Sequence, residues 1–305
     1  MRRVDLRLLI IHENPRPDSS CNDLIKTALE LGHEVKYVRT RRLIARLSRT
    51  GMEVIDYSTH DRVDCYDGGV VRSFGHMISL SQFMRRVAIL RLLELRGVVL
   101  MNPVSSLVEA RNKLLTLIKL KSAGIPVPET LSTESLRVAY DEAKRMCPLV
   151  MKPIIGSRGY GVVLAQDADT VFNIMKSSLT YGQPLLLQEY VESRGCDIRA
   201  FVVGSQVIAA MRRRATQSWK TNIAQGGKGE AIRLSEELEE LAIRAAQVMN
   251  LWYAGVDIVE GKEGTYVLEV NASPEWRELK HVAGVNPAKY IIEFLVEKVK
   301  SGELP

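Results

Sequence analysis

Hydrophobic and polar positions alternate with two different periods over the first hundred residues. Short apolar runs of strand composition are Val4 to Ile11, Glu34 to Val38, Gly68 to Arg72 and Val98 to Met101. Between them, Ser19 and Ser79 open stretches with helical spacing, and Gly32 and Gly97 follow these stretches as stop signals. This alternation of strands and helices predicts a small parallel sheet with helices on its faces over residues 1–101.

A second unit is predicted over residues 102–185. Its expected elements are a helix from Ser105 to Ala123, a short strand near Thr130, a helix from Glu134 to Arg145, and strands at Leu149 to Lys152 and Val162 to Ala165. Gly124 stops the first helix, and two prolines make its exit rigid.

Arg72 ends a strand of the first unit, so it is a candidate clamp for a carboxylate or phosphate, and a solvent-facing arginine is the alternative.

Residues 186–305 form the third predicted unit. It begins in an apolar run from Pro184 to Val191 and continues with a hairpin that turns at Gly204-Ser205. A helix capped by Ser235 and a final helix from Pro287 to Val299 complete it. No internal repeat or low-complexity tract is present.

The strongest chemical signal is a second hairpin in the third unit. Two apolar runs flank Gly261-Lys-Glu-Gly264, and a three-residue loop closing on Gly264 in the left-handed region sets Asp257 opposite Glu269. Side chains two apart in a strand share a face, so Asn271 joins Glu269 while Leu268 and Val270 point to the other side. Two carboxylates and an amide oxygen on one face suit magnesium. Acids on a solvated hairpin face are the simpler interpretation, but apolar flanks make unpaired acids costly.

A glycine-rich loop, Gly156-Ser157-Arg158-Gly159-Tyr160-Gly161, joins two strands of the second unit. It lacks the ending of a P-loop, and it leads into a strand, which excludes a dinucleotide-binding turn. Glycine lets backbone amides approach an anion closely, and Ser157 and Arg158 add donors. Lys152, at the end of the preceding strand, would add a point charge to the same phosphates. The loop is therefore a candidate phosphate flap, and a plain mobile turn is the alternative.

Net charge and composition limit the kinds of ligand and partner that the sequence predicts. The 305 residues carry a formal net charge of +6, which favours an anionic ligand. Arginines 39, 41, 42, 46 and 49 gather in one segment that we interpret as a solvated helix face, because no aromatics interleave with them as a nucleic-acid platform requires. An anionic substrate and nucleic acid are the alternative partners of this segment. Asp197 and Arg199 share a strand face, either as a weak ion pair or as contacts to the ribose and a phosphate of a nucleotide.

Cysteine and histidine positions exclude several chemistries. The four cysteines have no pairing pattern, so neither a disulfide framework nor a zinc site is indicated. The five histidines have no metal-ligand spacing. No secretory signal or transmembrane run is apparent, and we expect a cytoplasmic protein. There is also no nucleophile elbow of the Gly-x-Ser-x-Gly type.

Taken together, these motifs resemble the ATP-grasp superfamily, and within it the RimK-like carboxylate–amine ligases. The motifs that carry the resemblance, in chain order, are Lys152 with the glycine loop, Gln188-Glu-Tyr-Val191, Asp197-Ile-Arg199, Asn222, Asp257, Glu269-Val-Asn271 and Ser273-Pro274. The resemblance implies α/β and α+β architecture, with a Rossmann-like N-terminal domain followed by a two-subdomain ATP-grasp fold. It also implies amide formation through an acyl phosphate, with ATP and Mg²⁺ or Mn²⁺, two ions in all.

Site roles follow from the resemblance position by position. Residues expected to hold the nucleotide are Lys113, Lys152, Gly156, Ser157, Arg158, Gly159, Gly161, Gln188, Glu189, Tyr190, Val191, Asp197, Arg199, Lys220 and Thr221. Arg213 and Asn222 are the expected catalytic residues, which would stabilise the oxyanion and the departing phosphate. Asp257, Glu269 and Asn271 are the expected metal ligands.

The resemblance is incomplete where substrates should bind. Lys220-Thr-Asn222 stands where relatives commonly carry Arg-Ser-Asn, and Gln225-Gly-Gly227 replaces Arg-Gly-Gly. Glu275-Trp-Arg-Glu278 replaces the usual Gly-Leu-Glu-Gly. Two other stretches, Arg72 to Arg96 and Gly284 to Ala288, look most like those of archaeal members that add glutamate to coenzymes such as tetrahydromethanopterin. This resemblance makes glutamate and a small carboxylate acceptor the expected substrates. A deazaflavin coenzyme, a protein C-terminus and an amino-group carrier protein are alternative acceptors, and a non-catalytic nucleotide-binding regulator is the alternative of a different class. No membrane partner is expected, and homo-oligomers are common among such ligases.

Overall fold

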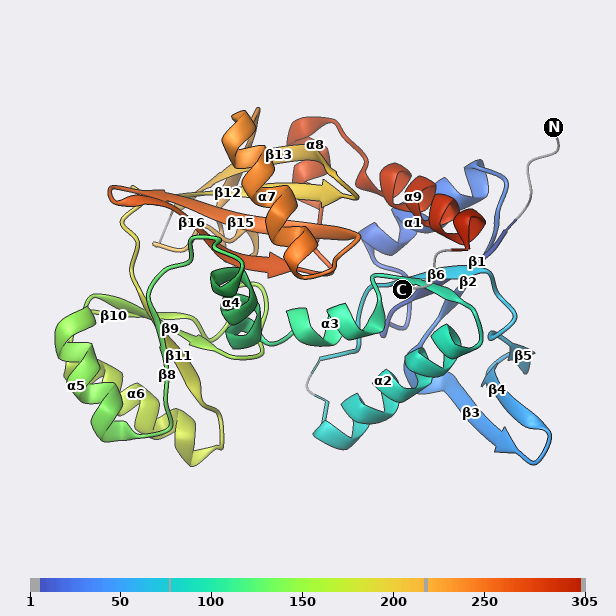
Figure 1. The fold of residues 1–305 in the computed structure, drawn as a ribbon, viewed down its shortest axis with the longest axis horizontal. Helices are drawn as coiled ribbons and strands as arrows, with labels where there is room; N and C mark the ends of the chain where they lie inside the picture. Colours follow the sequence, from blue (N-terminus) through green and yellow to red (C-terminus); the bar gives the residue numbers. More distant parts are fainter. Residues whose placement is uncertain (1–5, 77, 217–218, 303–305) are drawn as a thin grey trace.

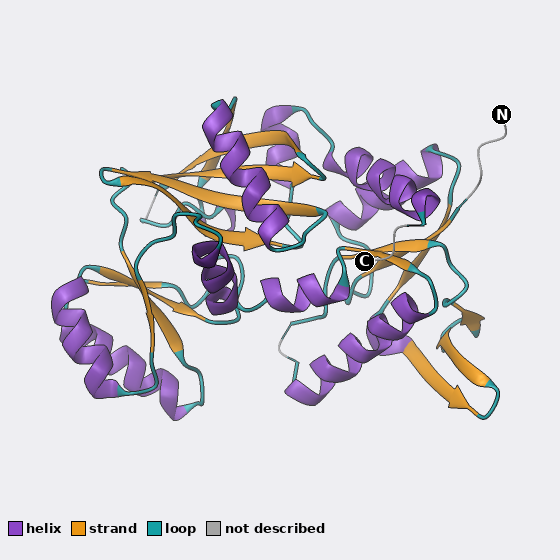
Figure 2. Ribbon diagram, in the orientation of Figure 1, coloured by secondary structure: helices purple, strands orange, loops and turns teal. Residues whose placement is uncertain are grey.

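The computed structural model describes residues 6–76, 78–216 and 219–302, and it places the site between three sheet-based units (Figure 1). Helices cover the sheets in each unit (Figure 2). None of the described helices is both long and apolar enough to cross a membrane.

The first unit is a four-stranded sheet in the order β2-β1-β6-β7, and all its pairs are parallel. Its strands are β1 (Arg7–Ile11), β2 (Glu34–Val38), β6 (Gly68–Val71) and β7 (Val99–Met101). On one face, Leu8 and Ile10 pack with α1 (Ser19–Glu30) and α9 (Pro287–Ser301), whereas Leu9 and Ile11 pack with α2 (Leu80–Leu95) on the other. The small parallel sheet with helices on both faces is confirmed. The last helix of the chain thus completes the first unit.

The arginine-rich segment predicted as a helix face is instead a short 3-10 turn followed by a β-hairpin. After a 3-10 turn, η1 (Thr40–Arg42), β3 (Leu43–Ser48) pairs antiparallel with β4 (Gly51–Asp56), which also pairs with β5 (Asp61–Arg62). The turn at residues 49–50 lets β3 and β4 satisfy each other's backbone groups. Spacing of the arginines alone does not separate a helix from such a hairpin. In Figure 1 the hairpin projects from the first unit, away from the second and third.

The single helix predicted from Ser105 to Ala123 is two helices, α3 (Val104–Ala110) and α4 (Lys113–Ser122). The first helix ends at Ala110, and Asn112 caps the second, because its side-chain oxygen accepts a hydrogen bond from the Leu115 amide at 3.1 Å. Lys113 therefore lies in the first turn of α4, and its amide donates to the carbonyl of Ile154 at 3.1 Å. This contact holds Lys113 beside the strand that precedes the glycine loop.

The second unit is a four-stranded antiparallel sheet in the order β10-β9-β11-β8. Its elements are β8 (Thr130–Ser132), α5 (Leu136–Met146), β9 (Leu149–Pro153), β10 (Val163–Ala165), α6 (Ala168–Thr180) and β11 (Leu185–Glu189). The predicted boundary between residues 185 and 186 falls at the start of β11, yet β11 pairs with β8 and β9. Its pairing partners group this strand with the second unit, because an apolar run alone does not indicate which sheet it enters.

The third unit is a five-stranded antiparallel sheet in the order β14-β13-β12-β15-β16. Its elements are β12 (Cys196–Val203), β13 (Gln206–Arg214), η2 (Ile223–Gln225), β14 (Lys228–Ile232), α7 (Glu236–Val248), β15 (Tyr253–Gly261), β16 (Gly264–Asn271) and α8 (Arg277–Ala283). Ala242 of α7 packs with Ala200 on one face, and Leu279 of α8 packs with Phe201 on the other. Strand alternation puts Asp197 and Arg199 on the face of Phe201.

Asn102 joins the first unit to the third. Its buried side-chain amide donates to the carbonyls of Tyr253 and Ala272, each at 2.8 Å, and its oxygen accepts from the amides of Trp252 and Tyr253. One side chain satisfies four backbone groups that burial would otherwise leave unpaired. The carboxyl edge of the parallel sheet is therefore fixed against the third sheet.

Candidate functional site

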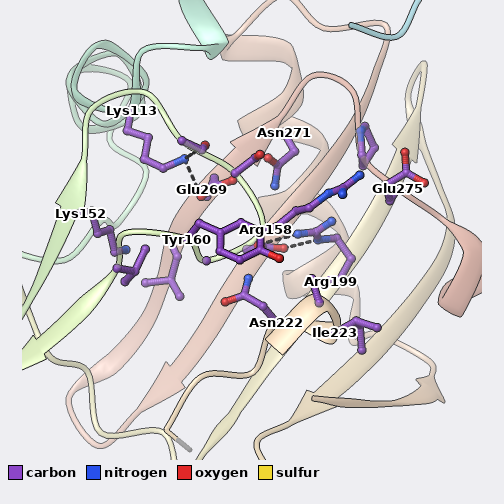
Figure 3. A pocket seen from close by; sticks show the side chains of 18 of the residues that line it. Lys113, Lys152, Arg158, Tyr160, Arg199, Asn222, Ile223, Glu269, Asn271 and Glu275 are labelled. Carbon is purple, nitrogen blue, oxygen red and sulfur yellow. Dashed lines mark hydrogen bonds and ion pairs between the residues drawn. The ribbon is translucent and has the colours of Figure 1, made fainter. Parts of the chain in front are cut away.

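A cavity of about 1100 Å³ lies where the three units meet. Its wall contains every residue that the sequence predicts for nucleotide, metal or catalytic roles, from Lys113 and the glycine loop to Asn271. Figure 3 shows Lys113 and Lys152 at one end, Glu275 at the other, and Glu269 and Asn271 between them. The structure therefore brings the predicted residues together, while their individual roles remain predictions. A volume of this size accommodates a nucleotide together with a second substrate.

The hairpin that carries the predicted metal ligands has the expected pairing, reached by a different route. Asp257 lies opposite Glu269, but Gly261 pairs with Gly264, so the loop holds two residues instead of three. The extra residue is taken up by a bulge beside Asp257. Because the bulge breaks the alternation, Leu268 lines the cavity instead of pointing away as predicted.

Two arginines neutralise Asp257. Arg199 binds both carboxylate oxygens of Asp257, and Arg213 Nη2 lies 3.0 Å from Asp257 Oδ2. Burial alone would raise the pKa of Asp257, but these two cations hold it well below its ordinary value. The carboxylate is ionised at neutral pH, as a metal ligand must be.

Arg213 also binds a second acid. Its Nε and Nη2 donate to Asp197 at 2.7 and 2.6 Å, and Thr221 Oγ1 donates to the same carboxylate at 2.6 Å. Asp197 and Arg199 therefore do not pair with each other, although they share a strand face, because each finds its partner on a neighbouring strand. Arg213 is buried, and its two acids raise the pKa of its guanidinium against the effect of burial.

Glu269 is balanced by Lys113, whose Nζ lies 3.0 Å from Glu269 Oε2. Burial would raise the pKa of Glu269, but Lys113 lowers it below its ordinary value. Asn271 follows two residues later and lines the same cavity. Two ionised carboxylates and an amide oxygen are the donor set that a hard divalent cation prefers, so the residues fit the metal that the sequence predicts. An arriving cation would replace the positive charge that Arg199, Arg213 and Lys113 now supply.

Lys152 is enclosed at the same end of the cavity as Lys113. Its Nζ donates to Gln188 Oε1 at 2.5 Å, and Gln188 in turn donates to Thr130 Oγ1. Burial lowers the pKa of Lys152 to about 8. Beyond Gln188, the ring of Tyr190 meets Trp219 edge to face with centroids 6.0 Å apart. The pair is suited to enclose a planar base, and Trp219 was not predicted from the sequence.

The glycine loop contacts two separate segments. Lys113 Nζ donates to the carbonyl of Gly156 at 3.0 Å, and Lys220 Nζ donates to that of Gly159 at 3.2 Å. Arg158 has a positive φ of 59°, a conformation that non-glycine residues seldom adopt. Figure 3 shows Arg158 and Tyr160 extended across the middle of the cavity. The loop thus lies over the site as a flap.

Arg72 is not exposed to solvent, so the interpretation as a solvent-facing arginine is wrong, while the interpretation as a clamp stays a prediction. It is buried, donates to the carbonyl of Pro274 at 2.9 Å, and its guanidinium carbon lies 4.4 Å from the ring centre of Trp276. It also pairs with Glu275, a residue that we had noted only as a departure from the family pattern. Contacts between residues about 200 positions apart leave no local signal in one sequence.

Comparison with solved structures defines the fold class of this protein. It superposes with a TM-score of 0.77 on the ATP-grasp ligase PsnB, solved with a precursor variant, Mg and ADP, at 22% identity over 97% of this chain and 100% of that one. D-alanine–D-alanine ligase of Bacillus anthracis, solved with ATP, matches with a TM-score of 0.68 at 16% identity over 97% and 98% of the two chains. The fold is that of ATP-grasp ligases.

Sequence comparison gives the particular family. Residues 110–295 match the RimK-like ATP-grasp domain, and the chain belongs to that family of ATP-dependent, ADP-forming ligases. It is 33% identical to tetrahydromethanopterin:alpha-L-glutamate ligase of Methanocaldococcus jannaschii over 93% of this chain and 97% of the relative. It is 31% identical to a probable alpha-L-glutamate ligase of Histophilus somni over 97% and 100%.

Proposed function

We propose that this ligase joins L-glutamate to the carboxylate of a small coenzyme, with tetrahydromethanopterin as the first acceptor to test. One observation carries the proposal: a single cavity contains the flap, two lysines and three oxygen donors on adjacent strands. The similarity to glutamate ligases along almost the whole chain supports the choice of amino acid.

In this proposal the nucleotide occupies the end of the cavity that holds Lys152. Gln188, Glu189, Tyr190 and Val191 line this end and would enclose the adenine. Lys152, Lys113 and the flap amides would contact the phosphates, where positive charge and backbone donors stabilise transferred phosphoryl groups. The remaining predicted nucleotide contacts are Ser157, Arg158, Asp197, Arg199, Lys220 and Thr221. Asp197 would act near the sugar through the network it forms with Arg213 and Thr221.

Asp257, Glu269 and Asn271 would hold the divalent cation. When bound, one or two Mg²⁺ or Mn²⁺ ions supply positive charge to the phosphate oxygens during transfer. Arg199 and Lys113, which balance the same acids in this structure, would then be available to contact anionic substrate groups.

The chemistry proceeds in two displacements. The acceptor carboxylate attacks the γ-phosphorus of ATP, ADP leaves, and an acyl phosphate forms. The neutral amino group of glutamate then attacks the acyl carbon, a C–N bond forms, the C–O bond to the phosphate breaks, and the proton lost from nitrogen leaves on inorganic phosphate. Arg213 and Asn222 would stabilise the oxyanion and the departing phosphate. No side-chain nucleophile is needed.

An ADP-release assay tests the function. With ATP, Mg²⁺ and L-glutamate, we expect tetrahydromethanopterin to stimulate ADP release, and the comparison acceptors are a deazaflavin coenzyme, an amino-group carrier protein and a peptide with a free C-terminus. A different acceptor that stimulates release would correct the substrate. ATP binding with no stimulation by any acceptor would favour the non-catalytic regulator.

Asn271→Ala tests the metal assignment. Removing one oxygen ligand should lower turnover by about 100-fold or more, since charge stabilisation of the transferred group is lost. Magnesium affinity, measured by calorimetry with ADP present, should fall as well. Asn173→Ala is the matched control, because Asn173 is exposed on α6 and bonds only locally to the carbonyl of Asp169. Near-normal turnover and magnesium affinity in Asn271→Ala would refute the ligand assignment.

A further inference from the structure

We propose that Glu275 is the residue that binds the amino group of the incoming amino acid. The inference rests on the proposed function and names the binding site of its second substrate. Glu275 follows Pro274 in the stretch where this sequence departs from its family pattern, and no role has been assigned to it above.

The position of Glu275 is a natural place for a ligand. In the first sheet the chain runs from β1 to β2 on one side and to β6 on the other, so the switch in strand order lies between β1 and β6. Ligands of open parallel sheets bind outside the carboxyl ends of the strands at such a point. His12 and Arg72 follow these two strand ends, and both line the cavity with Glu275. The amino-acid site would therefore lie between the first and third sheets.

Buried groups hold Glu275 in place. Arg72 Nη2 donates to Glu275 Oε1 at 3.1 Å, and Ser20 Oγ donates to Oε2 at 2.8 Å. Arg72 has a side chain only 1% exposed, whereas the side chain of Glu275 is 46% exposed. The Arg72 Nε has no hydrogen-bond partner. Burying a guanidinium with one N–H unpaired costs free energy. We infer that Arg72 is kept in this position because it orients the carboxylate of Glu275.

Glu275 retains capacity for a ligand. A carboxylate oxygen accepts two hydrogen bonds, and each oxygen of Glu275 has one side-chain donor in the described structure. Three other acids of the cavity also pair with cations, Asp197 and Asp257 with arginines and Glu269 with Lys113, but their side chains are less exposed than that of Glu275. Nearby His12 is no competing cation, because its Nδ1 accepts from the Asn14 amide at 2.9 Å and burial lowers its pKa. An ammonium group is the ligand that this half-exposed carboxylate attracts.

The arrangement also places the two proposed substrates, nucleotide and amino acid, at opposite ends of the cavity. Figure 3 places Lys152 at one end, Glu269 and Asn271 in the middle and Glu275 at the far end. A nucleotide at the lysine end and an amino acid at Glu275 would meet at the predicted metal ligands.

Calorimetric binding to the full chain tests the assignment without turnover. With Mg·ADP bound, we expect L-glutamate to bind the wild type, and N-acetyl-L-glutamate, which has no ammonium group, to bind at least about tenfold more weakly. Glu275→Gln should weaken L-glutamate binding by a similar factor and leave Mg·ADP affinity unchanged. Ser20→Ala should weaken L-glutamate binding severalfold. This variant keeps the pair between Arg72 and Glu275, so it tests the site in case Glu275→Gln folds poorly.

Two further variants make the test specific. Glu278→Gln alters the other acid at this end of the cavity, and Glu297→Gln alters an exposed acid on α9. Equal L-glutamate affinity in wild type and Glu275→Gln, a larger loss in Glu278→Gln, or tight binding of the acetylated probe would overturn the inference. So would Mg·ADP binding without any L-glutamate binding. Failure of the wild type to bind Mg·ADP would count against the proposed function itself.

Discussion

Lys152 illustrates how burial sets the charge of a single side chain. Its pKa is lowered by burial from the ordinary 10.5 to about 8, while Glu269 opposes the shift. Between these two values the unfolded chain binds more protons than the folded one, so this group's contribution to stability rises with pH over that window. Its contribution to phosphate binding has the opposite sign, because only the protonated amine attracts phosphate.

We therefore predict that metal-free ADP binds with nearly constant affinity below pH 7. Its affinity should fall by about tenfold per pH unit above pH 8, since one proton must then be taken up on binding. Calorimetry between pH 6.5 and 9.5 measures this profile.

Two variants test whether Lys152 causes the pH dependence of ADP binding. Lys152→Met should bind ADP weakly and with no pH dependence in the same window, whereas Lys144→Met alters an exposed lysine of α5 and should keep the wild-type profile. A flat wild-type profile up to pH 9.5 would show that Lys152 does not titrate as described.

Residue chemistry was the part of the site that the sequence predicted best. Spacing alone placed Asp257 opposite Glu269 and put Lys152 beside the flap. Partners of these residues were not predictable, because Arg199 and Arg213 reach Asp257 from two other strands. The pairing of Arg72 with Glu275 was not predicted for the same reason, since this contact joins the first sheet to a turn of the third unit.

At the scale of elements, the segment after β13 holds the flap and the cavity wall together. Lys220 bonds to the flap, Thr221 bonds to Asp197, and the Gly227 amide donates to the carbonyl of Asn222 at 3.1 Å. A Cβ on Gly227 would lie 2.1 Å from the carbonyl oxygen of Thr221. The backbone of this segment closes on itself so tightly that only glycine fits.

Gly227→Ala should therefore displace Thr221 and Asn222 from the cavity. We expect metal-free ADP to bind at least about tenfold more weakly, a loss comparable to that of one or two charge-assisted hydrogen bonds, with little change in melting temperature. Gly97→Ala is the contrasting control: it strains a positive φ at the end of α2, so it should lower melting temperature and leave ADP affinity unchanged. Equal ADP affinity in wild type and Gly227→Ala would contradict this view of the segment.

Elements were predictable where periodicity was strong and ambiguous where turns decided the outcome. The helix after Ser79 and the parallel strands of the first unit follow from pattern alone. The arginine-rich segment was wrong as a helix, because its backbone pairing depends on the turn before Gly51. For the hairpin at Gly261, the pairing of Asp257 with Glu269 was predicted correctly, but the three-residue loop was not. The structure has a two-residue loop and a bulge instead.

At the scale of the whole molecule, the first unit depends on the last helix. Leu295 of α9 is fully buried, and a Cβ on Gly68 of β6 would lie 3.2 Å from its Cδ1. Gly68 has no side chain of its own at this contact, so α9 packs directly against the strand. The cleft between the first and third units is thus held in place both by α9 and by Asn102.

Leu295→Ala should lower the free energy of unfolding by about 2–5 kcal/mol, because it opens a cavity in this contact. Hydrogen exchange should quicken at β1 and β6, more than 220 residues away in the sequence. Glu293→Ala, an exposed change on the same helix, should have almost no effect. Unchanged exchange in β1 and β6 of Leu295→Ala would show that α9 does not support the sheet.

The return of α9 to the first sheet has a consequence for how the polypeptide is made. While the ribosome is still translating the middle of the message, β1 and β6 have been synthesised but the helix that covers one of their faces has not. Leu8, Ile10 and Val70 are then left partly uncovered. The nascent chain must keep this surface from premature association until residues 287–301 emerge, so the second and third sheets have the opportunity to form before the wall that carries Arg72 is complete.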